Sequence, residues 1–221
     1  MRFCLGVVVI KMQAVIEVPF LDTESARPWP VASLPAFSWL VLDADCAGAE
    51  VGLFVAALAD RLDVAAPAGR DEVVAALLAE EILVVAGGLR LFDTVTEVTV
   101  VPGCCAGLED WRDWGQVLTG SPPWLGHDPW PVVEIDETDH LRVRQDGGPN
   151  RHSGPWAAIE VALPRHVMPD LLRNVQQDLI GFLAQLKTWT QRVGLVETGT
   201  ALTEAIDRHF AITAPLDIPT D

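Results

Sequence analysis

The sequence predicts an α+β protein in which a mixed or antiparallel sheet packs against several helices, including a long C-terminal amphipathic helix. Short segments rich in Val and Ile alternate with helical segments without a regular repeat. Half of the 221 residues are hydrophobic, which is enough to bury a core. Apolar residues also recur every three or four positions over residues 171–193. We therefore expect one domain over residues 1–221, with 146–154 as the only candidate for an internal boundary.

The first half of the chain gives both strand and helix signals. Residues 3–18 read as one long strand or two strands, and residues 37–42 read as another. Apolar residues then fall at helical spacing over residues 51–62 and again over residues 71–78. These segments supply at least two strands and two helices.

The middle of the chain predicts further strands. Residues 83–85, 89–92 and 95–101 are strand candidates, the last with alternating side chains. Residues 131–135 and 140–144 flank a polar turn and predict a hairpin.

Two helices are expected at the C-terminal end. Over residues 171–193 the helical pattern follows Pro169, which suits a first turn, and precedes Gly194, which suits a stop. A shorter helix follows, with Leu202, Ile206 and Phe210 on one side.

The charge of the chain favours a basic partner. The chain has 31 acidic and 15 basic residues, a formal net charge of −16, which argues against nucleic-acid binding. Residues 43–110 carry thirteen acids against Arg61, Arg70 and Arg90. Such a segment either steers a basic protein toward the chain or only keeps the chain soluble.

The short apolar runs and the small number of cysteines indicate the cellular compartment. Apolar runs at residues 3–10 and 82–89 are too short to span a membrane. Four cysteines, two of them adjacent, do not make a disulfide framework in a chain of this length. We expect a cytoplasmic protein with no membrane partner.

Residues 98–130 crowd four of the eight tryptophans and the two adjacent cysteines into one segment. The runs GCCAGLEDWRDW at 103–114 and PWLGHDP at 123–129 resemble a block in uncharacterised actinobacterial proteins, which often carry a third cysteine where this chain has Ala106. The resemblance implies a family but no activity. It permits an immunity protein that neutralises a secreted toxin.

Tryptophan spacing predicts both a core face and a docking face in this segment. Trp111 lies on a helical stripe with Leu108 and Leu118, and we expect it in the core. Tryptophan is enriched where partners dock, so the others and their acidic neighbours form the predicted partner-binding site. That site comprises Glu109, Asp110, Asp113, Trp114, Trp124, His127, Asp128 and Trp130.

The adjacent cysteines have two interpretations. Cys104 and Cys105 either pack as small apolar residues or act as nucleophiles with His127 as base, in a small hydrolase or thiol-dependent enzyme. A thiol close to a helix N-terminus gains thiolate character. Adjacent cysteines are a poor zinc spacing, even with His140 or His152 added, so no metal or cofactor is expected.

A third function class comes from one short motif. Asp43 and Asp45 follow an apolar strand as D-x-D, which resembles the opening of haloacid-dehalogenase-type phosphatases. The resemblance implies a nucleophilic carboxylate and magnesium, whereas the residues alone suggest a turn at a strand end. Taken together, the sequence favours an acidic protein-binding domain, most plausibly an immunity or antitoxin-like partner of a basic protein.

Overall fold

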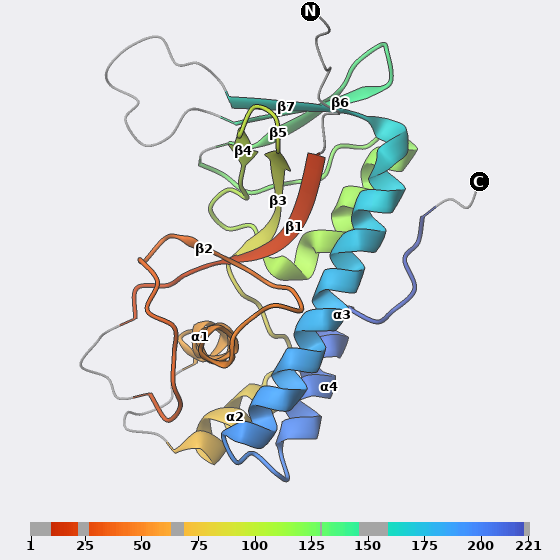
Figure 1. The fold of residues 1–221 in the computed structure, drawn as a ribbon. Coiled ribbons are helices and arrows are strands. Elements are labelled where there is room, and N and C mark those ends of the chain that lie inside the picture. The colour runs from red at the N-terminus through yellow and green to blue at the C-terminus, as the bar shows by residue number, and fades with distance from the viewer. Residues whose placement is uncertain (1–9, 22–26, 63–68, 129, 146–158, 219–221) are drawn as a thin grey trace, which may run out of the picture.

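The computed structural model describes residues 10–21, 27–62, 69–128, 130–145 and 159–218. Figure 1 shows two sheets against which the helices pack. Both sheets are antiparallel, and a long helix follows them near the C-terminal end, so the predicted α+β class is confirmed. The boundary suggested at 146–154 lies outside the described residues.

The first sheet is built around the N-terminal strand. β1 (Ile10–Glu17) lies between β2 (Trp39–Val41) and β3 (Gly87–Asp93), and β4 (Thr99–Val100) pairs with β3 at the other edge. The strands expected at residues 37–42 and 89–92 are therefore confirmed, while residues 3–9 of the first expected strand lie outside the described residues.

Two of the expected strands are wrong in part or in full. The strand expected at 95–101 is reduced to β4, because the Asp93 carboxylate accepts hydrogen bonds from the Val95 and Thr96 amides and closes a turn. Residues 83–85 form no strand. There the amides of Leu83 and Val85 donate to side chains, those of His209 and Glu109, rather than to a neighbouring strand.

The second sheet contains the predicted hairpin. β5 (Val132–Ile135) pairs with β6 (His140–Gln145), which pairs with β7 (Ile159–Pro164). The buried Gln145 side chain joins the two sheets by accepting a hydrogen bond of 2.8 Å from the Val101 amide.

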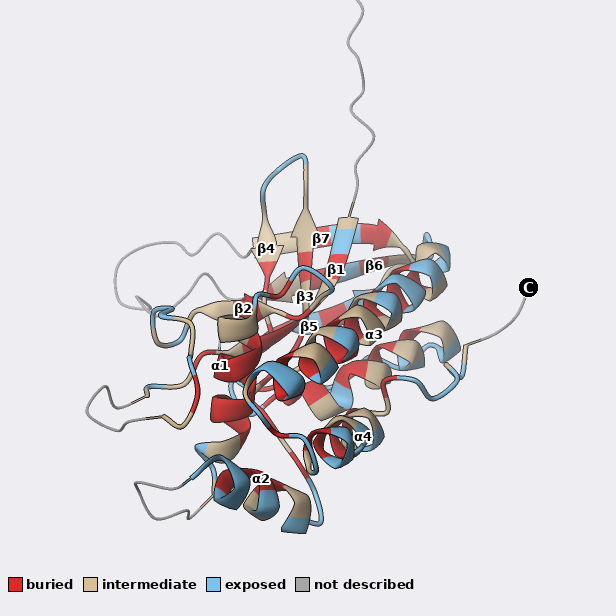
Figure 2. Ribbon diagram, turned by 60° about the horizontal axis from the view of Figure 1, so that its bottom comes forward, coloured by how far each residue is buried: buried red, intermediate tan, exposed pale blue. Residues whose placement is uncertain are grey.

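Four α-helices occupy the segments where helical spacing was found. They are α1 (Gly48–Ala59), α2 (Arg70–Ala79), α3 (Met168–Arg192) and α4 (Gly199–Phe210), with a short turn η2 (Arg165–Val167) before α3. Every residue from Val51 to Leu58 is buried, which makes α1 a central helix (Figure 2). Phe54 of α1 lies edge-on to Phe182 and Phe210, with ring centroids 4.9 and 6.1 Å apart. Buried side chains from both sheets and all four helices belong to one core cluster.

The helix expected after the cysteines is a 3-10 helix, η1 (Leu108–Thr119). Its buried residues are Leu108, Trp111, Trp114 and Val117, which recur every third position. A 3-10 helix has 3.0 residues per turn, so side chains three apart are aligned on one face. Trp111 is in the core as predicted, and Val117 takes the place that α-helical spacing had given to Leu118.

Candidate functional site

Backbone hydrogen bonds join the two halves of the Cys- and Trp-rich segment. Gly103 donates its amide to the Leu125 carbonyl at 2.8 Å, and Cys104 donates to the Asp128 carbonyl at 2.9 Å. The His127 amide in turn donates to the Cys104 carbonyl at 2.8 Å. The cysteine turn and the loop that carries His127 therefore form one unit, although about 20 residues of η1 and its flanks lie between them.

Two glycines allow this close approach. A Cβ atom on Gly103 would lie 2.2 Å from the His127 carbonyl oxygen. Gly126 has a φ of +91°, and a Cβ there would lie 2.6 Å from the carbonyl oxygens of Gly103 and Cys104. Any larger residue at either position would push the cysteine turn and the His127 loop apart.

An exposed aromatic cluster is built on this unit. Trp124 and Trp130 are 53% and 49% exposed, and the exposed His127 lies between them. Its ring centroid is 5.5 Å from that of Trp124 and 5.4 Å from that of Trp130, both in edge-to-face geometry. We call Trp124, His127 and Trp130 the Trp–His–Trp cluster. It exposes two large apolar rings that the core does not use.

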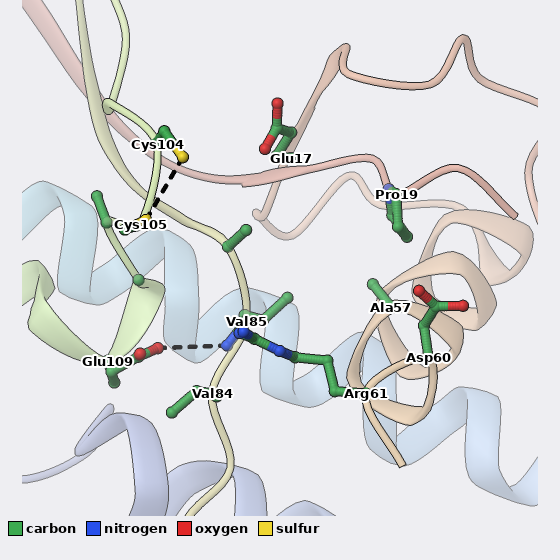
Figure 3. A pocket seen from close by; sticks show the side chains of 13 residues that line it. Glu17, Pro19, Ala57, Asp60, Arg61, Val84, Val85, Cys104, Cys105 and Glu109 are labelled. Atoms are coloured by element: carbon green, nitrogen blue, oxygen red, sulfur yellow. Dashed lines mark hydrogen bonds between the residues drawn. The ribbon is translucent and has the colours of Figure 1, made fainter. Parts of the chain in front are cut away.

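A pocket of about 540 Å³ is lined in part by the cysteine turn (Figure 3). Its walls come from the ends of β1 and α1, the segment 84–86, the turn 104–107 and the first turn of η1. The charged groups that line it are Glu17, Asp60, Arg61 and Glu109. Three carboxylates against one guanidinium make it an acidic pocket.

Burial raises the pKa of two of these carboxylates. Desolvation raises the pKa of Glu17 above its usual range. Desolvation also raises the pKa of Glu109, against the opposing effect of the Val85 amide, which donates a hydrogen bond to it, and of the Arg61 charge. Carboxylates whose pKa is raised by burial in a pocket are typical of functional sites.

The two thiols line the same pocket and are both exposed. Their Sγ atoms lie 3.4 Å apart, and Cys105 has a φ of +69°. The interpretation that they pack as small apolar residues is therefore wrong. Backbone hydrogen bonds hold the chain on either side of the turn in place. Both cysteine side chains line the pocket.

The environment of the Cys104 thiol does not match that of an activated nucleophile. The Cys105 thiol, by hydrogen bond and charge, raises the pKa of Cys104, and the Glu17 and Asp128 carboxylates raise it further. The thiolate character expected from the helix N-terminus is therefore outweighed. Cys46 lies elsewhere and is buried, and desolvation raises its pKa to about 11.

The other predicted site residues are divided between surface and core. Trp114 is only 2% exposed, so its assignment to a partner-binding surface is wrong, because the threefold repeat of η1 places it beside Trp111 in the core. Asp110 and Asp113 lie on the same helix, where partial burial and mutual charge raise the pKa of Asp110. Glu109 lines the pocket and Asp128 adjoins the cluster. Pro129 lies outside the described residues.

The fold around Asp43 and Asp45 does not support the phosphatase interpretation. Catalytic carboxylates of that kind follow a strand of a parallel sheet, at its carboxyl edge, whereas β2 is the edge strand of an antiparallel sheet. The Asp43 carboxylate accepts a hydrogen bond of 2.9 Å from the Asp45 amide. The motif is the turn at the end of a strand.

Two further features concern the described part of the chain. These residues hold no group of three or more His, Cys, Asp and Glu side chains arranged to bind a metal ion, and His152 lies outside them. Among the same residues, no helix combines the length and apolarity needed to cross a bilayer.

Sequence reasoning missed three charged residues of the pocket, Glu17, Asp60 and Arg61. Glu17 ends an apolar strand and Arg61 follows α1, and each looked like an ordinary surface charge. The only available signal for Glu17 was a charge at the end of a run of Val and Ile; for Arg61 there was none.

Comparison of the chain with models of known protein families, with curated proteins and with solved structures gives no match. Function is therefore argued from the site itself.

Proposed function

We propose that this chain is an acidic protein-binding domain that docks a basic protein, in the manner of an immunity or antitoxin-like partner. The observation that carries the proposal is the exposed Trp–His–Trp cluster, which shares the cysteine turn with an acidic pocket. Partner surfaces commonly combine aromatic anchors with a complementary charge that guides the approach.

The charges near the turn favour a cationic group on the partner. Glu17 and Asp128 both act on the Cys104 thiol, so carboxylates flank the turn that links pocket and cluster. Inserting an Arg or Lys side chain into the pocket would offset the desolvation of Glu17 and Glu109. The net charge of −16 would also speed encounter with a basic protein.

A second hollow of about 380 Å³ has the opposite character. Trp29, Trp189, Arg70 and Arg192 line it, and it holds no carboxylate. Its two guanidinium groups would repel a basic partner, so this hollow is a less favourable docking face than the acidic pocket and the cluster.

The thiol-dependent enzyme receives less support. A nucleophilic cysteine needs a lowered pKa or an adjacent base, whereas the pKa of Cys104 is raised. The ring of His127 lies edge-on against two tryptophans instead of serving a thiol.

The test is capture of partners from a native-host lysate, followed by binding kinetics. Wild-type, Trp124→Ala and Glu17→Gln proteins serve as bait, with Val196→Ala as a control at an exposed apolar residue between α3 and α4. We expect a basic protein whose dissociation from Trp124→Ala is about 30-fold faster, the effect of losing an anchor worth about 2 kcal/mol. Association should slow as salt rises, and Glu17→Gln should slow it at low salt.

Two outcomes would contradict the proposal. One is capture of the same proteins, with equal dissociation rates, by all four baits. The other is an association rate that salt leaves unchanged.

A further inference from the structure

The paired thiols form a preorganised unit that protein binding does not use. The two sulfurs are 3.4 Å apart on one wall of the acidic pocket, and both side chains are exposed. The left-handed φ of Cys105 and the hydrogen bond of 3.1 Å from the Ala106 amide to the Gly103 carbonyl define the turn that holds them. Gly126 packs against the backbone of the same turn. Two sulfur ligands that are already close together lose little conformational freedom when they bind the same atom.

The separation of the sulfurs indicates which centre they could share with the least movement of the side chains. At a metal–thiolate length of about 2.3 Å, a sulfur separation of 3.4 Å corresponds to an angle of about 95° at the centre. A tetrahedral ion would need sulfurs about 3.8 Å apart, and a linear one about 4.6 Å apart, at the same bond length. An angle near 95° is that of a three-coordinate pyramidal centre with a lone pair.

We propose that Cys104 and Cys105 bind a trivalent thiophilic metalloid, of the class of arsenite and the organic arsenoxides. The protein supplies two sulfurs, and the metalloid keeps its third substituent, a hydroxide or an organic group. The pocket of about 540 Å³ has room for that substituent. Only two protein ligands are needed, which fits the absence of any larger metal-binding group among the described residues.

The reaction balances without an oxidant or reductant. An arsenoxide, R–As=O, reacts with two thiols; two S–H bonds break, two S–As bonds form, and the oxide oxygen leaves with both protons as water. Arsenic stays trivalent throughout.

A disulfide is a poorer product for the same pair. Consecutive Cα atoms are about 3.8 Å apart, whereas disulfides usually need at least about 4.4 Å. A metalloid bridges the sulfurs at their present separation and leaves the turn unchanged.

The test uses phenylarsine oxide and intact-mass spectrometry of the folded protein. A Cys4→Ser background removes the cysteine outside the described residues and leaves the dithiol and the buried Cys46. We expect one adduct per chain, displaced by dithiothreitol but not by an equal thiol concentration of 2-mercaptoethanol. Arsenite should compete for the same site.

Single-thiol variants decide whether both sulfurs take part. Cys104→Ser and Cys105→Ser should each weaken binding at least about 100-fold, because the second bond no longer forms within one molecule. Cys46→Ser should bind like the background protein. Circular dichroism checks that each variant is folded. Absence of an adduct, or an adduct that either single-thiol variant keeps at full affinity, overturns the proposal.

Discussion

Two pairs of tryptophans in one segment have opposite environments. Trp111 and Trp114 of η1 are buried, whereas Trp124 and Trp130 of the following loop are about half exposed. Along η1 a repeat of three residues turns each successive apolar side chain to the same face. In the loop, hydrogen bonds to the cysteine turn fix the backbone and leave the rings outside. The backbone, and not the residue type, decides which tryptophans stabilise the fold and which remain available to a partner.

The comparison predicts a large difference in stability between the two pairs. Trp111→Ala should lower the free energy of unfolding by about 3–5 kcal/mol, because it empties a core site and removes the Nε1 hydrogen bond of 2.8 Å to the Phe210 carbonyl. Trp124→Ala should change it by less than about 0.5 kcal/mol. Urea unfolding of both variants measures the contrast, and similar midpoints would contradict it.

Two glycines give a contrast of intermediate size. Gly126 and Gly120 both have a left-handed φ, at +91° and +87°, but a Cβ meets nothing within 4 Å at Gly120. Gly120→Ala should therefore cost about 1 kcal/mol, from backbone conformation alone. Gly126→Ala should cost about 2–4 kcal/mol, because the added methyl group must also displace the carbonyl oxygens of the cysteine turn. Thermal or urea unfolding compares them; equal losses would show that the close approach is not tight.

The smallest expected effect depends on pH. Burial raises the folded-state pKa of Glu17 above its unfolded value of about 4.3. Ionised Glu17 therefore destabilises the folded protein. This loss of stability is absent at pH values below the pKa of the unfolded state and complete at pH values above the pKa of the folded state. Glu17→Gln should be slightly more stable than wild type at pH 7 and equal to it near pH 3.5. Urea midpoints at both values test this, and a variant less stable at pH 7 would refute it.

Most of the fold follows from local patterns in the sequence. The helices α1 to α4 and the β5–β6 hairpin each have their own periodicity, which survives folding because one face packs into the core. Residues 83–85 look like a strand and are not one. Their amides are satisfied by His209 and Glu109, partners that lie far away in sequence and leave no local signal.

The candidate site was less predictable from the sequence. Trp124 and Trp130 are exposed, so they remain candidates for the predicted partner-binding site. Trp114 is buried, because α-helical spacing does not reveal a repeat of three residues. Cys104, Cys105 and Glu109 were candidates, but the pocket that they line was not predicted. It brings Glu17, Arg61 and Glu109 together from three elements, and only the tertiary fold creates that proximity.

The hydrogen bonds of η1 to a distant segment have a consequence for synthesis of the chain. Trp111 donates to the Phe210 carbonyl, and Arg112 donates to the carbonyls of Ala211 and Pro215. These acceptors are made about a hundred residues later, which takes roughly 5–20 seconds at ribosomal rates of about 5–20 residues per second. Throughout that interval two tryptophans destined for the core have no complete site to enter. The apolar face of η1 therefore stays without part of its packing site until the C-terminal segment has been made.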